Sequence, residues 1–222
     1  MFKRNRERDQ AAVPADMAGA RANLYDLLIN IFNQLPDRTF LKNIEDGLFE
    51  ELFHGFAGVE YLKAYRSRIG QCAPEEVVAE LSVDRTRILR GTGPWELKPP
   101  YEGCYKRNCD LGTAIMGVKC SYRSGGLMLD ETVPESPDYL CVELDFMKHL
   151  CKREKDERTS AGNAAETLIM QAAFLREHLG CWIEDFCEQV EKHALTDFYR
   201  GVFLILKDFI AKETIYLQDM NP

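Results

Sequence analysis

The chain has 222 residues, of which 45% are hydrophobic and 29% are charged, and its formal net charge at pH 7 is -8. A chain of this length and composition can fold as one globular domain with a sizeable core. The acidic balance argues against nucleic acid or an anionic membrane surface as the main partner, and it suits a basic ligand.

The N-terminal segment, MFKRNRERDQ, is basic but leads into no apolar stretch, so it predicts neither a secretory nor a twin-arginine export signal. We expect residues 1–20 to form a basic, frayed tail ahead of one domain at residues 21–222. The longest apolar run, VFLIL, is too short to cross a bilayer, so no membrane insertion is expected. Eight cysteines without an export signal indicate reduced thiols and a cytoplasmic protein.

Helical periodicity governs the N-terminal third of the chain. In RANLYDLLINIFNQLPD the apolar residues recur every three or four positions until Pro36 ends the pattern. Shorter amphipathic helices are predicted at residues 40–44, 48–56 and 59–69, and another begins at Pro74.

The middle of the chain has a different composition. Seven of the fifteen glycines and five of the nine prolines lie between Gly91 and Pro137, which predicts a loop-rich region with one helix at residues 111–122.

The segment ESPDYLCVELDFMKHLCKRE predicts a helix that starts with Ser136 as its cap, Pro137 at its first position and Asp138 in its first turn. Glu143 falls near the middle of the apolar arc of this helix and should be buried. A buried carboxylate needs a partner, either inside the fold or on a ligand.

Three more segments complete the pattern. KREKDERTSAGN is predicted to be a polar, mobile connection. AETLIMQAAFLREHL is helical and is followed by a break at Gly180, a helix in CWIEDFCEQVEKH that holds Trp182 in the core, and a last helix from near Thr196. No sustained period of two is present, so the predicted class is an all-α helical bundle with a central loop region rich in proline and glycine.

Metal binding by the cysteines and catalysis by the histidines are the two alternatives to ordinary packing of these residues. The closest cysteine pair, Cys104 and Cys109, has no second pair to complete a tight zinc motif, so a cysteine-based metal or redox protein is the rival hypothesis rather than the preferred one. The four histidines lie in no nucleophile motif, so we expect no enzymatic activity and no metal.

A third candidate is a cluster of aromatic and acidic residues on two loops. PWELKPPYEGCY contains Trp95, and PESPDY begins the predicted helix at Ser136. Prolines beside aromatic rings can form a rigid wall, and carboxylates beside that wall can hold a cationic peptide. The alternative is an ordinary loop packed on the helical core.

Four blocks of the sequence carry a resemblance to a known family: PPYEGCY, GLMLDETVPESPDYLCVELDFMKHL, FLREHLGCWIEDF and DFYRGVFLILKDFIAKE. In this order they resemble the signature blocks of the TorD/DmsD/NarJ family of redox-enzyme maturation chaperones. The likeness runs from about Arg21 to Glu213.

The resemblance implies an all-helical chaperone that has no cofactor of its own. Its partner would be the apo form of a molybdenum-containing oxidoreductase subunit or the twin-arginine signal peptide of that subunit, held back from export until the client has its cofactor. The alternative is a client that is never exported, as for the nitrate reductase assembly members. The resemblance also allows a monomer or a domain-swapped dimer.

Two family signatures map onto this sequence, and both depart from the family pattern. The motif Glu-x-Pro-Asp-His falls on residues 135–139, with Tyr139 in place of histidine, and the motif of an aromatic residue followed by Leu-Phe falls on residues 85–89, with Arg85 in place of the aromatic residue. We predict a client-binding groove formed by Arg85, Ile88, Leu89, Tyr101, Glu102, Glu135, Asp138 and Tyr139. Structural roles are predicted for Glu143, Pro137 and Trp182, and Glu143 is expected to accept hydrogen bonds from loop amides or from an arginine.

Overall fold

The computed structural model describes residues 15–93, 96–106, 110–130, 132, 134–160 and 162–220. Over these residues the chain is all-α, as the sequence predicts, and an isolated antiparallel bridge between Tyr101 and Tyr139 is the only strand-like pairing. The helices of the described ranges are α1 (Ala15–Asn33), α2 (Arg38–Glu45), α3 (Leu48–Leu52), α4 (Val59–Ile69), α5 (Pro74–Arg90), α6 (Glu102–Tyr105), α7 (Leu111–Ser124), α8 (Leu140–Thr159), α9 (Ala165–Glu177), α10 (Leu179–His193) and α11 (Asp197–Met220).

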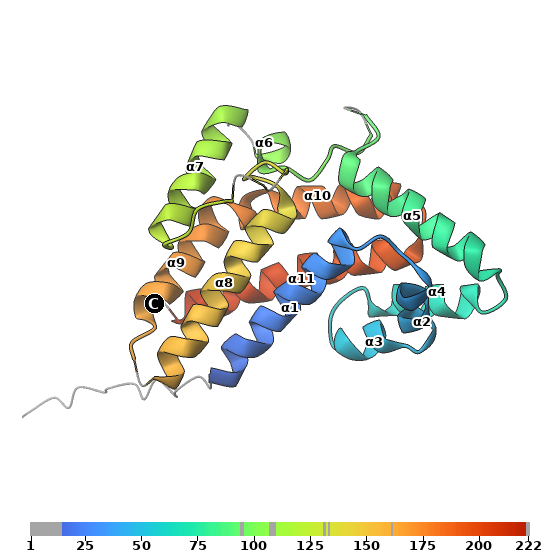
Figure 1. Ribbon diagram of the computed structural model, residues 1–222, viewed down its shortest axis with the longest axis horizontal. Helices are drawn as coiled ribbons and strands as arrows, with labels where there is room; N and C mark the ends of the chain where they lie inside the picture. Colours follow the sequence, from blue (N-terminus) through green and yellow to red (C-terminus); the bar gives the residue numbers. More distant parts are fainter. Residues whose placement is uncertain are drawn as a thin grey trace, which may run out of the picture.

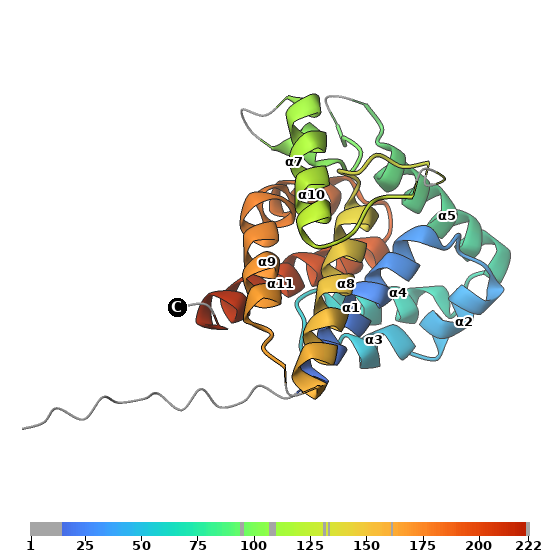
Figure 2. The ribbon, with the colours of Figure 1, turned by 60° about the vertical axis from the view of Figure 1, so that its left-hand side comes forward.

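The helices pack as one bundle. α8 lies along α1 and packs more extensively on it than on any other helix, while α11 packs against α4, α9 and α10 (Figure 1). The view in Figure 2 keeps α1 and α8 side by side and shows α2, α3 and α4 grouped beside α1. Pairs of helices that are distant in sequence therefore form the centre of the molecule.

Aromatic side chains hold the centre of the bundle together. Phe203 of α11 stacks on Phe32 of α1 with ring centroids 4.8 Å apart. Phe186 of α10 contacts the Phe203 ring edge-on, with centroids 5.3 Å apart. All three side chains are buried. Each buried ring of this size stabilises the fold by about 1.5 to 3 kcal/mol relative to exposure, so this cluster joins α1, α10 and α11 tightly.

Two glycines let α4 and α11 touch through their backbones. Gly58 precedes α4 with a φ of 98°, and a Cβ atom placed on it would lie 2.4 Å from the Gly201 carbonyl oxygen. A Cβ atom on Gly201 would lie 2.8 Å from the Gly58 carbonyl oxygen. Both positions therefore need glycine, one for its backbone angle and both for the close approach.

A buried ionic network joins four helices near the C-terminal end of α8. The Arg21 guanidinium of α1 donates 2.7 Å hydrogen bonds to Glu213 of α11 and to Glu154 of α8, and it also donates to Gln171 of α9. The Tyr25 hydroxyl donates to Glu213 at 3.0 Å. Each buried charge therefore has a partner of opposite sign, as burial requires.

Several helix boundaries differ from their predictions, the first two at the start of α1 and the end of α8. The first helix begins at Ala15, within the segment predicted to be a frayed tail, and residues 1–14 lie outside the described ranges. The connection predicted at KREKDERTSAGN is helical as far as Thr159, because α8 continues through it. Pairs of opposite charge four residues apart, Arg153 with Glu157 and Arg158 with Glu154, stabilise this end of α8.

The break between α9 and α10 also differs from its prediction. It falls at His178, whose φ of -127° and ψ of -103° are not helical, and Gly180 already belongs to α10. The short helix α6 in the central loop region was not predicted. Its four residues are too few for a periodic pattern to reveal them.

Candidate functional site

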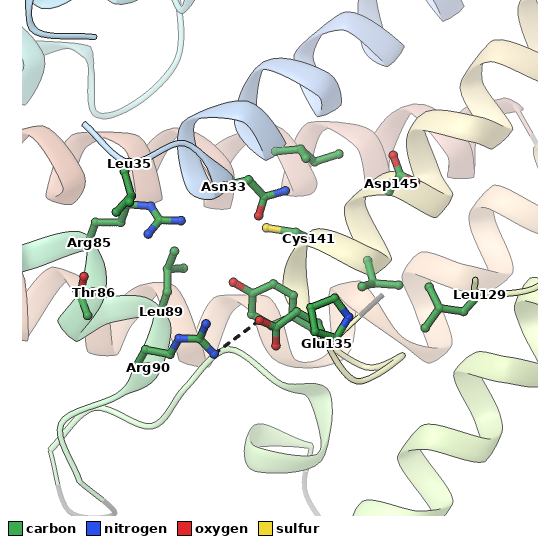
Figure 3. A pocket seen from close by; sticks show the side chains of 14 residues that line it. Asn33, Leu35, Arg85, Thr86, Leu89, Arg90, Leu129, Glu135, Cys141 and Asp145 are labelled. Carbon is green, nitrogen blue, oxygen red and sulfur yellow. Dashed lines mark ion pairs between the residues drawn. The ribbon is translucent and has the colours of Figure 1, made fainter. Parts of the chain in front are cut away.

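A groove with a volume of about 800 Å³ lies between the C-terminal end of α1, the last turns of α5, the segment 134–139 and the first turns of α8 (Figure 3). Four of the predicted client-binding residues line it: Arg85, Leu89, Glu135 and Tyr139. The other lining residues are Ile29, Asn33, Leu35, Thr86, Arg90, Leu129, Pro134, Cys141, Val142 and Asp145. We call this the α1–α5–α8 groove.

The wall formed by α5 follows from helical spacing. Arg85 and Leu89 are four residues apart and face the groove, whereas Ile88 points into the core and is 1% exposed. The prediction that Ile88 lines the groove is therefore wrong. Arg85 Nε donates a 2.7 Å hydrogen bond to the Phe32 carbonyl in the last turn of α1, where a positive charge is favoured by the helix dipole.

Glu135 provides the main acidic group on the opposite wall. The Tyr101 hydroxyl donates a 2.8 Å hydrogen bond to Glu135 Oε2, and the Arg90 guanidinium lies 3.4 Å from Glu135 Oε1 (Figure 3). Burial and the bond to Glu135 raise the pKa of Tyr101 to about 12, so the hydroxyl stays protonated and keeps donating at neutral pH. Tyr101 thus contributes to the groove through Glu135 and does not line it.

Backbone pairing between two loops positions Tyr139. Glu102 N–H donates to the Asp138 carbonyl at 2.9 Å, Leu140 N–H donates to the Pro100 carbonyl at 3.0 Å, and the rings of Tyr101 and Tyr139 lie 5.2 Å apart. This pairing uses the backbone groups that a helix would need, so α8 starts at Leu140. The prediction that Ser136 caps this helix is wrong, because Ser136 lies in the turn that precedes α8.

Asp138 is buried and occupied by partners within the chain. It is 0% exposed, and it accepts hydrogen bonds from Gly103 N–H at 3.1 Å and from the Ser136 hydroxyl at 2.5 Å. The prediction that Asp138 lies in the first turn of the helix is wrong, because α8 starts at Leu140. In this conformation Asp138 joins the 134–139 segment to α6 instead of facing the groove.

Glu102 is likewise held inside the fold. Its side chain is 0% exposed, and its carboxylate accepts from Lys106 Nζ at 2.6 Å and lies 3.0 Å from His178 Nδ1. The other ring nitrogen of His178 lies 3.0 Å from the Ser121 hydroxyl. Glu102 is predicted to contact a client, but its partners here are Lys106 and His178, and it does not line the groove.

Glu143 is fully buried, as predicted, and has an internal donor. Trp182 Nε1 donates a 3.1 Å hydrogen bond to Glu143 Oε2, so the donor is an indole and not the predicted arginine or loop amide. Burial raises the pKa of Glu143 well above its ordinary range, and the nearby negative charge of Glu102 adds to that rise. Burial therefore favours the neutral form of this carboxyl group over its ionised form.

Trp182 and Pro137 also lie where they can support the site. Trp182 is 0% exposed and stacks on Tyr105 with ring centroids 5.8 Å apart. The Pro137 carbonyl accepts a 2.7 Å hydrogen bond from the Tyr122 hydroxyl of α7. Both contacts are with elements that flank the groove, and the structural roles of these residues remain predictions.

The groove combines an apolar surface with charges of both signs. Leu35 is 63% exposed at the mouth, and Asp145 stands on the α8 side, where it pairs with Lys148. Such a surface suits a peptide that has apolar and basic residues, because the apolar part gains from burial and the basic part meets carboxylates.

The α1 wall of the groove was not found from the sequence. Ile29, Asn33 and Leu35 reach the site because α1 packs on α8, which is a long-range contact. The sequence shows Leu35 as an apolar residue just before Pro36, which ends the helical pattern. No sequence pattern near Leu35 indicates that it lies beside α8.

Two observations bear on the cysteine hypothesis. In the ranges that the structure describes, His, Cys, Asp and Glu side chains do not gather in threes that could hold a metal ion. Cys109 lies outside these ranges, as does Trp95 of the aromatic cluster, and Cys104 is half-buried with a pKa raised by burial. Metal analysis of the purified protein is the direct test of this rival.

None of the described helices is long and apolar enough to cross a membrane.

Comparison with known proteins shows which family this chain belongs to. The family model for the nitrate reductase delta subunit matches residues 57–188, which is more than half of the chain. The chain therefore belongs to this family, that of the TorD-like redox-enzyme maturation chaperones, as its sequence blocks predict. No solved structure matches it.

Several curated relatives are named as chaperones and not as enzymes. The chain is 29% identical to the chaperone protein TorD of Vibrio parahaemolyticus over 92 residues, which cover 41% of this chain and 42% of that protein. It is 26% identical to the perchlorate reductase assembly chaperone protein of Dechloromonas aromatica over 110 residues, covering 50% and 49%. It is 25% identical to the chaperone protein TorD of Vibrio cholerae over 191 residues, covering 82% and 80%. The chain spans about half the length of the first of these relatives.

Proposed function

We propose that this chain is a cytoplasmic chaperone that binds a peptide segment of an apo molybdenum-containing oxidoreductase subunit in the α1–α5–α8 groove before the client is exported. The proposal is supported by the family and by its chaperone relatives. The observation that carries it is the groove itself, where residues of the two family signatures meet: Arg85 and Leu89 lie across from Glu135 (Figure 3), and Tyr139 also lines the groove.

The groove fits a twin-arginine signal peptide by its chemistry. The basic pair of such a peptide would meet Glu135 and Asp145, and its apolar stretch would cover Leu89, Leu35 and Tyr139. The matching family model, named for a nitrate reductase subunit, favours a second candidate. In that case the groove would take a client tail that has no arginine pair.

The test uses a synthetic peptide, the N-terminal segment of the molybdopterin oxidoreductase encoded beside the chain, and its Lys-Lys variant. We expect isothermal titration calorimetry to show binding of the peptide with the arginine pair and weaker binding of the Lys-Lys variant, because a guanidinium can bond a carboxylate through two N–H groups. Equal affinities would favour the non-exported client, and no binding of either peptide would contradict the proposal.

Leu35→Asp tests whether this groove is the binding surface. The side chain is exposed, so the folded state should tolerate the change, while an added negative charge on the apolar surface should weaken peptide binding by about tenfold or more. The matched control is Ile215→Asp on α11, a residue that is 60% exposed and does not line the groove. Equal affinities for the two variants would place the client elsewhere.

A further inference from the structure

The Glu135 carboxylate is a prepared acceptor for a guanidinium. Its side chain is 24% exposed, and the Tyr101 hydroxyl fixes Oε2, which leaves Oε1 turned toward the groove. The carboxylate is therefore partly desolvated and held in one orientation. Both properties strengthen a charge-assisted hydrogen bond.

A guanidinium of the chain itself already occupies this acceptor. Arg90 lies 3.4 Å from Glu135 Oε1, across the mouth of the groove, and its own side chain is 68% exposed (Figure 3). In the described part of the chain this ion pair is the one polar contact of the Arg90 guanidinium. The contact is long and solvated, so it is weak.

The two arginines of the groove differ in how firmly they are held. Arg85 is half-buried and bonds the Phe32 carbonyl, which makes it part of the packing between α5 and α1. Arg90 is the last residue of α5, directly before Gly91 with its φ of 76°, and its side chain reaches out over the groove. Only Arg90 can leave its position without breaking a contact between helices.

We propose that Arg90 is a resident competitor at Glu135, which a client cation must displace, so that Arg90 lowers the affinity of the groove for its peptide. This inference rests on the proposed function. An internal ion pair that must open before binding multiplies the association constant of the ligand by the fraction of time that the pair is open. This factor is the same for arginine and lysine ligands, so the preference for arginine comes from the Glu135 carboxylate itself.

The experiment measures binding of the same arginine-pair peptide and its Lys-Lys variant by calorimetry to wild type, Arg90→Ala, Glu135→Gln and the double variant. Because exposed ion pairs contribute up to about 1 kcal/mol, Arg90→Ala should tighten binding of the arginine peptide by about twofold to fivefold. The Lys-Lys peptide should gain by the same factor, because the open fraction of the ion pair does not depend on the ligand. In the Glu135→Gln background, Arg90→Ala should change neither affinity.

A matched control separates this effect from the loss of one positive charge. Arg38 and Glu75 form another exposed ion pair outside the groove, and their side chains are 63% and 72% exposed. Arg38→Ala should leave peptide affinity unchanged, and thermal unfolding of each variant checks that the fold is retained.

The outcomes separate the inference from the proposed function. If wild type binds the peptide and Arg90→Ala binds no more tightly, the inference is wrong while the proposed function stands. If Arg90→Ala tightens binding equally in the Glu135→Gln background, Arg90 acts by simple charge repulsion and the inference is again wrong. If neither wild type nor Arg90→Ala binds the peptide, both are contradicted.

Discussion

Single residues in this protein show how burial decides what a carboxylate can do. Glu102, Asp138 and Glu143 are all 0% exposed, and they lie close to the loops that shape the groove. Each has an internal donor: Lys106, Gly103 N–H and Trp182 respectively. The acidic groups that remain for a ligand are the more exposed ones, Glu135 and Asp145.

Glu143→Gln should change how stability depends on pH. Folding raises the pKa of Glu143, so its contribution to the free energy of unfolding is fully present below the ordinary glutamate range and is lost as pH rises toward the folded pKa. Glutamine keeps the bond to Trp182 and has no proton to lose. The variant should therefore gain stability relative to wild type as pH rises from about 5, by up to about 1.4 kcal/mol per pH unit.

Urea unfolding at pH 5, 6.5 and 8 measures this difference. The control is Glu60→Gln, because the Glu60 side chain is 83% exposed and pairs only with Lys63 on the surface. A difference between Glu143→Gln and wild type that stays constant over this range would show that Glu143 is ionised in the folded protein.

At the scale of elements, the close approach of α4 and α11 depends on glycine. The backbones of α4 and α11 meet at Gly58 and Gly201, and backbone atoms cannot move aside as a side chain can. This contact places the α2–α4 group against the long C-terminal helix, and α2 in turn packs on α5, which forms one wall of the groove.

Gly201→Ala should destabilise the protein by about 1 to 3 kcal/mol, because the new methyl group would overlap the Gly58 carbonyl and force the helices apart. Thermal and urea unfolding measure the loss. The matched control is Gly70→Ala, where the added Cβ atom finds its nearest neighbour, the Ser67 carbonyl oxygen, at 3.9 Å and the backbone angle is ordinary. That change should be neutral or slightly stabilising, and equal losses for the two variants would contradict the close-approach argument.

For the whole molecule, the Arg21 network joins helices from both ends of the chain. Arg21→Met should destabilise the protein by about 3 to 5 kcal/mol, because the Glu213 carboxylate stays buried without its cation. The exposed pair of Lys42 and Asp46 serves for comparison, and Lys42→Met should cost less than about 1 kcal/mol. Chemical denaturation of both variants decides between a structural ion pair and a dispensable one.

The fold class and most helices could be predicted from the sequence because helical periodicity is a local property. The helix at Val59–Ile69 has the predicted bounds, and Pro74 starts α5 as expected. The start of α8 was mispredicted because the residues around Tyr139 pair with the loop around Tyr101, and no local pattern reveals that partner. The end of α8 was mispredicted because the polar segment after Cys151 contains Glu154, whose partner Arg21 lies far away in sequence.

Four of the residues that line the groove were named from the sequence. The family signatures gave Arg85, Leu89, Glu135 and Tyr139, which lie on two segments that the fold brings together. Which residues of those segments line the groove could not be read from the sequence: Ile88 and Leu89 are both buried, and only the direction that the backbone gives each side chain puts Leu89 at the groove. The oligomeric state and the client contacts remain predictions.

The packing of α8 on α1 has a consequence for how the chain reaches its native state. Closing the roughly one hundred residues between these helices costs loop entropy that grows with the logarithm of loop length, and the gain from their contact comes only afterwards. The chain should therefore fold more slowly than its helical content alone indicates. During synthesis α1 has to wait for α8, so the groove is incomplete on a growing chain that ends before Asp145, the lining residue nearest the C-terminus.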